Sequence, residues 1–119
     1  MTSNEEIFDS SIQPDGSLAG VYEQDSESGY FYLYNLRKPE GYKVVAAIHI
    51  HSGELAILSG DVRIDWSKKG TAVGLFLKGK LWAAFADTAE YWFIGSEGKN
   101  AQSELPFWLR NAFDVDRPH

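Results

Sequence analysis

The sequence predicts an α+β fold, in which a mainly antiparallel, curled β-sheet of six or seven strands is followed by a short C-terminal helix. Residues 61–87 give the first indication, because they contain three strand-like runs separated by connections that end in glycine. Residues 105–112 give the second, because Leu105, Trp108, Leu109 and Ala112 recur at the spacing of one helical face. A series of strands followed by a helix is typical of the α+β class.

The second of these connections is Lys78-Gly79, which joins residues 71–77 to residues 80–86. A two-residue loop with glycine second favours a primed hairpin turn, because glycine accepts a positive φ without strain. The resulting register places apolar side chains on both faces, so we expect the hairpin to be covered on both sides. One predicted face carries Ala72, Gly74, Phe76, Leu81, Ala83 and Phe85, and the other carries Val73, Leu75, Leu77, Trp82 and Ala84.

The first connection is compatible with two registers. We favour a three-residue loop over residues 68–70, because it gives Gly70 the left-handed position of a bulge. This register places the apolar residues of the segment 62–66 on the predicted face of Phe76. A four-residue loop would move them to the face of Trp82, because a slip of one residue inverts every side chain. In both registers, the charged residues of this strand share its opposite face; they are Asp61, Arg63 and Asp65.

The rest of the chain is expected to form a flexible acidic arm, residues 1–17, and a single domain, residues 18–119. Further strands are expected over residues 18–24, 30–35, 43–51 and 90–94, which are rich in β-branched and aromatic side chains. Ser103 is the expected N-cap of the C-terminal helix.

Composition and charge exclude several classes of function. The 119 residues include no cysteine, which removes disulfides and thiolate metal sites and fits a cytoplasmic protein. The net charge is −6, and residues 1–36 hold seven acidic groups with no Lys or Arg. Such a chain does not attract phosphate, so we expect neither nucleic acid nor membrane as a partner. The acidic segment is compatible with a basic protein partner, although solubility alone also explains it.

Candidate sites for chemistry are weak, and no cofactor is predicted. His49 and His51 are two residues apart on a predicted strand, so both imidazoles could reach one metal ion. A zinc site needs more protein ligands than these two, and a histidine on a strand is more often a partly exposed sheet residue. Asp61 and Asp65 could form an acid–base pair, but we favour a solvated strand face with Arg63 between two acids. We therefore predict no catalytic residue and consider an enzyme the third alternative.

Large aromatic side chains provide the best candidates for an interaction surface. Alternation places Tyr30, Tyr32 and Tyr34 on one strand face, where they are either an amphipathic edge of the core or a recognition surface. Trp82 and Trp92 add more aromatic surface than one small core needs. We therefore predict a non-catalytic protein-interaction module, which could form a homodimer through a sheet face or edge. The alternative is a small-molecule or metal-binding β-domain that uses His49, His51 and the tyrosines.

Several segments resemble a small bacterial domain family of unknown function. The likeness begins at residues 22–32, YEQDSESGYFY, and continues at residues 47–51, AIHIH, at residues 64–67 and at residues 84–87, AFAD. It covers about residues 20–95. The chain departs from the pattern at Trp82-Ala83, where the family has a Pro-His pair, and residues 103–113 have no counterpart. The resemblance implies no activity, and only by analogy of composition is the chain similar to toxin-neutralising immunity proteins.

Overall fold

A computed structural model describes residues 6–53, 56–93 and 107–113. This part of the chain forms two four-stranded antiparallel sheets, in each of which strands adjacent in sequence are adjacent in space. The first sheet contains β1 (Ile7–Ile12), β2 (Leu18–Gln24), β3 (Ser28–Asn35) and β4 (Val44–Ser52). A 3-10 turn, η1 (Ser59–Asp61), leads to the second sheet, which contains β5 (Val62–Trp66), β6 (Ala72–Leu77), β7 (Lys80–Ala86) and β8 (Tyr91–Phe93). The helix is α1 (Phe107–Phe113).

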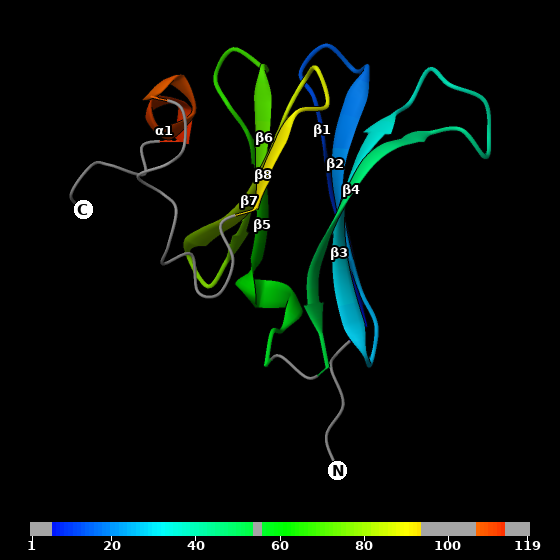
Figure 1. Cartoon of the computed structure of the whole chain (residues 1–119), viewed down its shortest axis with the longest axis vertical. Helices are drawn as coiled ribbons and strands as arrows, with labels where there is room; N and C mark the ends of the chain where they lie inside the picture. Colours follow the sequence, from blue (N-terminus) through cyan, green and yellow to red (C-terminus); the bar gives the residue numbers. More distant parts are fainter. Residues whose placement is uncertain (1–5, 54–55, 94–106, 114–119) are drawn as a thin grey trace.

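The two sheets lie face to face, and α1 lies on the outer side of the second sheet (Figure 1). The main core fills the space between the sheets, where the side chains of Tyr22, Phe31, Leu75 and Phe85 are completely buried. The expected antiparallel strands and short C-terminal helix are confirmed. The fold is nevertheless largely β rather than α+β, and the expectation of one curled sheet of six or seven strands is wrong, because the described strands form two sheets. Within the described residues, no helix has the length and apolar character needed to cross a membrane.

Strand β1 occupies six of the seventeen residues that the sequence assigned to a flexible arm, residues 1–17. It pairs along its whole length with β2, from Ile7 opposite Gln24 to Ile12 opposite Ala19. Ile7 is buried in the main core, and the Trp66 indole N–H donates a 2.8 Å hydrogen bond to the Ser11 carbonyl. The acidic composition hid this strand, because only one of its side chains enters the core cluster.

The central hairpins show one correct turn and one wrong register. Lys78 and Gly79 both have positive φ, at 52° and 82°, which confirms the primed turn. In the preceding connection, the Ser67 N–H donates to the Ala72 carbonyl, so four residues form the loop and the favoured three-residue register is wrong. Gly70 is nevertheless left-handed, with a φ of 72°.

A β-bulge at Trp82 changes the predicted faces of β7. Phe76 lies opposite Leu81 as expected, but Leu75 lies opposite Ala83. Beyond the bulge, Ala83 and Phe85 therefore point into the main core, and Ala84 points outward with Phe76. The prediction that both faces are covered is confirmed, because the first sheet covers one face and Leu109 of α1 is buried against the other.

Candidate functional site

The outer face of the first sheet is the best candidate for a functional surface. Its side chains form three rows across the four strands, because the register aligns one residue of each strand in every row. No described element covers this face, as the right-hand side of Figure 1 shows. We call it the tyrosine face. Its rows are Phe8–Glu23–Tyr30–His49, Ser10–Val21–Tyr32–Ala47 and Ile12–Ala19–Tyr34–Val44.

The three tyrosines stand in the middle of this face, as the alternation of β3 predicted. The ring centroids of Tyr30 and Tyr32 are 5.9 Å apart in a stacked arrangement, and the Tyr34 ring meets that of Tyr32 edge-on at 6.1 Å. The His49 ring lies 4.9 Å from the Tyr30 ring. Because each aromatic ring packs against a neighbouring ring, these side chains lose little rotamer entropy when a partner binds.

Large apolar side chains at both ends of β1 remain in solvent. Phe8 is 67% exposed and Ile12 is 60% exposed, whereas Val21 in the middle row is only 3% exposed. The larger neighbouring side chains therefore cover Val21, and their own outer surfaces remain free. A contiguous apolar patch on a sheet face is a feature of contact surfaces.

The charged groups at the end of the tyrosine face that holds Tyr30 and Tyr32 are acidic. Glu23 is the one Asp, Glu, Lys or Arg side chain in the three rows. Asp25, in the adjacent β2–β3 turn, accepts backbone hydrogen bonds from Glu27 and Ser28, which lower the pKa of its carboxyl group. The pKa of Tyr32 is raised by partial burial and then by the negative charge of Glu23, so its hydroxyl stays neutral. This end of the face therefore offers aromatic rings beside two carboxylates.

The two candidate metal ligands lie on opposite sides of the first sheet, so the expectation that they share a face is wrong. Ile50 is an extra residue in β4, because Gly29 pairs with His51 and Tyr30 pairs with His49. His49 stays on the tyrosine face, whereas His51 Nε2 lies 3.2 Å from the Tyr22 hydroxyl at the end of the core. Within the described part of the chain, no group of three His, Cys, Asp or Glu residues is placed to hold a metal ion.

The other predicted residues occupy structural positions. Trp82 is 7% exposed and belongs to the main core, so it does not contribute to a surface. Trp92 packs edge-on against Trp108 of α1, with ring centroids 6.1 Å apart. Arg63 pairs with Asp65 at 2.6 Å, and its guanidinium carbon lies 4.2 Å from the centre of the Phe76 ring. This exposed ion pair supports the structural interpretation of Asp65, the acidic residue of β5.

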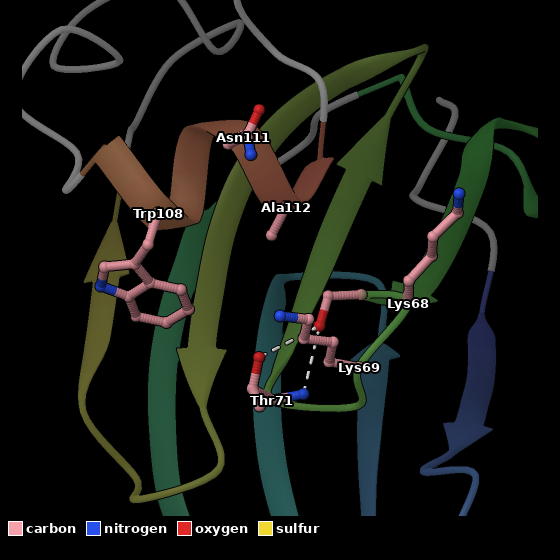
Figure 2. A pocket seen from close by; sticks show the side chains of 7 residues that line it. Lys68, Lys69, Thr71, Trp108, Asn111 and Ala112 are labelled. Carbon is pink, nitrogen blue, oxygen red and sulfur yellow. Dashed lines mark hydrogen bonds between the residues drawn. The ribbon is translucent and has the colours of Figure 1, made fainter.

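Sequence reasoning missed a cavity of about 510 Å³ between the β5–β6 loop and α1 (Figure 2). Lys68 and Lys69 of the loop and Trp108 of the helix are among the residues that line it. The signal in the sequence is the pair of lysines before Gly70, which by itself resembles an ordinary solvated turn. Only the packing of a helix from the far end of the chain makes the loop one wall of a cavity.

Comparison with known proteins identifies a family and no closer relative. A family model with the description "uncharacterized protein conserved in bacteria", DUF2251, matches residues 1–105. The resemblance to a small bacterial family of unknown function is therefore confirmed, over a longer stretch than the segments that suggested it. No curated protein and no solved structure matches the chain.

Proposed function

This chain belongs to DUF2251, an uncharacterised bacterial family, and we propose that it is a non-catalytic protein-interaction module. The observation that carries the proposal is the uncovered tyrosine face, in which the rings of Tyr30, Tyr32 and Tyr34 contact one another along β3. Tyrosine contributes large contact area at a low entropic cost and is enriched at protein interfaces. A cytoplasmic location, supported by the absence of cysteine, is part of this proposal.

The charge beside the rings indicates the chemistry of the partner. Glu23 lies in the same row as Tyr30, and Asp25 stays ionised in the neighbouring turn. A guanidinium or ammonium group placed over a tyrosine ring is attracted by the ring and can pair with either carboxylate. We therefore infer that the partner presents Arg or Lys side chains to the end of the face that holds Tyr30 and Tyr32.

A peptide titration tests the proposal. The probe is a short, extended peptide of alternating Arg and Thr residues, and its control has Glu in place of every Arg. The Arg peptide should shift the NMR resonances of Tyr30 and Tyr32, and the Glu peptide should leave them unchanged. Glu23→Gln should weaken binding by about two- to fivefold, the usual worth of an exposed charge contact.

The matched control is Glu90→Gln, which removes one charge beside the second sheet, where Glu90 accepts a hydrogen bond from Thr88. If Glu90→Gln weakens binding as much as Glu23→Gln, the peptide responds to net charge and the tyrosine face is not its site. Equal shifts with both peptides would also contradict the proposed charge preference.

A homodimer is the second candidate, and the exposure of Phe8 and Ile12 on the same face favours it. Two copies that stack through their tyrosine faces would remove these side chains from water in a closed twofold arrangement. Light scattering over a hundredfold range of concentration tests this candidate. A mass that stays near the 13.3 kDa of one chain would leave the face to a different partner.

A further inference from the structure

A second candidate site, independent of the tyrosine face, lies in the cavity between the β5–β6 loop and α1. Its volume of about 510 Å³ falls within the range of small-molecule sites, about 300 to 1,000 Å³. We propose that this cavity binds a small planar aromatic anion, such as an aryl carboxylate. Three properties of its walls support this ligand class: the sign of the charge, the supply of hydrogen-bond donors and an exposed indole ring.

The charge of the cavity is opposite to that of the whole protein. The chain carries a net charge of −6. The described residues that line the cavity nevertheless include Lys68 and Lys69 and no Asp or Glu. Figure 2 shows that the Lys69 side chain turns toward the space beneath α1, whereas the Lys68 side chain extends away from the helix. Lys69 is therefore the cation placed to meet a bound anion, and Lys68 provides a matched control of the same charge.

Hydroxyl groups at the base of the cavity add a hydrogen-bond donor. The Ser67 oxygen accepts hydrogen bonds from the backbone N–H groups of Thr71 and Ala72, at 3.1 and 3.2 Å. These two bonds use its acceptor capacity, so its own proton points to the Thr71 hydroxyl oxygen, 3.4 Å away. The Thr71 hydroxyl is then free to donate its proton to a ligand. Together with the Lys69 amine, it makes this side of the cavity suited to a carboxylate.

The opposite wall supplies a flat aromatic surface. Trp108 is 45% exposed although its ring is fixed by edge-on contact with Trp92, at a centroid distance of 6.1 Å and an angle of 79°. Leu109, the next residue in α1, is completely buried against the second sheet and holds the helix in place. A ring that is both fixed and half exposed can stack with a planar ligand at a low cost in side-chain entropy.

The two walls differ in their relation to the family. The loop lies within residues 1–105, which the family model matches, whereas α1 begins at Phe107. The cavity thus joins a segment inside the matched region to one outside it. We infer that the ligand site depends on the C-terminal helix of this chain.

The test compares 2-naphthoate with its uncharged analogue 2-naphthamide, using NMR of the tryptophan indole N–H groups in the full chain. Naphthoate should shift the Trp108 signal saturably, and Trp108→Leu identifies that signal by removing it. Naphthoate should bind at least about fivefold more tightly than naphthamide, a preference worth about 1 kcal/mol. Lys69→Met should abolish this preference, whereas Lys68→Met should retain it.

Three outcomes would overturn the proposal: equal affinity for the two probes, equal loss in Lys69→Met and Lys68→Met, or no saturable binding up to the solubility limit of naphthoate. A shift confined to the signal of another tryptophan would also overturn it, because it would place the aromatic group elsewhere. If both lysine variants unfold at the same midpoint as the parent protein, their differences in affinity reflect binding and not stability.

Discussion

The Tyr22 hydroxyl and His51 Nε2 lie 3.2 Å apart at the end of the main core, and both approach Gln24 Oε1, at 2.7 and 3.3 Å. The carbonyl of Gly53 can only accept a hydrogen bond, so its 3.2 Å contact with His51 Nδ1 places a proton on that nitrogen. Neutral His51 then has an acceptor at Nε2, and the Tyr22 proton is shared between two acceptors. Burial raises the pKa of Tyr22 far above its usual value, so this proton remains in place.

The first prediction concerns the pH dependence of folding. Partial burial lowers the pKa of His51 in the folded protein below its usual value of 6.5, with a smaller contribution from His49. Because the unfolded chain binds the proton more tightly, the contribution of His51 to stability is complete above pH 6.5 and decreases as the pH falls through the folded pKa. Urea unfolding between pH 8 and pH 5 should show this loss, and it should be smaller in His51→Gln. An unchanged pH dependence in His51→Gln would exclude His51 as its source.

The second prediction concerns the glycine on which this contact depends. A Cβ atom on Gly29 would lie 2.6 Å from both His51 Nε2 and the Tyr22 hydroxyl oxygen. Gly29→Ala should therefore lower the free energy of unfolding by about 1 to 3 kcal/mol, the cost of overpacking a core. The control is Gly60→Ala, where an added Cβ meets nothing within 4 Å. Similar urea midpoints for the two variants would show that the core adjusts around an alanine at position 29.

The third prediction concerns metal binding. His49 contacts Tyr30 on the outer face and His51 contacts Tyr22 in the core, so one ion cannot reach both without breaking β4. Calorimetry with zinc should detect no one-to-one site tighter than micromolar. A site of that affinity that is lost in His49→Ala/His51→Ala would contradict the placement of the two side chains.

Local patterns predicted most strands and the face of the tyrosines. Lys78-Gly79 identified its turn because glycine has a physical reason to occupy a position with a φ of 82°. The alternation of β3 placed Tyr30 and Phe31 on opposite faces, and the structure shows the first exposed and the second buried. Both features are determined by residues that are close in sequence, so one sequence is enough to predict them.

Bulges and the pairing of sheets could not be predicted in this way. Trp82 and Ile50 are extra residues whose hydrophobic character fits a regular strand equally well. Strand β1 was missed because its burial depends on contacts with β5, more than 50 residues away, such as the Trp66–Ser11 hydrogen bond. The cavity could not be predicted for the same reason, because one wall is the β5–β6 loop and the other is α1, which follows β8 in the chain. Residue Ser103, the expected N-cap, lies outside the described residues.

The fourth prediction concerns the β6–β7 turn. Gly79 has a φ of 82°, and an added Cβ would meet nothing within 4 Å, so backbone strain is the only cost of a side chain there. Gly79→Val should destabilise the protein by more than about 1 kcal/mol, because a β-branched residue resists positive φ. Gly79→Asn should cost much less, because asparagine tolerates the left-handed region. Equal thermal midpoints for the two variants would contradict strain as the cause.

The fifth prediction concerns the attachment of α1 to the second sheet. Leu109 is completely buried in a cluster with Phe76, Leu81 and Ala84, and Phe113 meets the Phe76 ring edge-on at 5.8 Å. Leu109→Ala removes the central contact of this cluster and should lower the free energy of unfolding by about 2 kcal/mol or more. Asn111→Ala, an exposed change in the same helix, should have little effect. If the two variants unfold at the same urea concentration, the contact of Leu109 with the outer face of β6 and β7 contributes nothing to the stability of the two packed sheets.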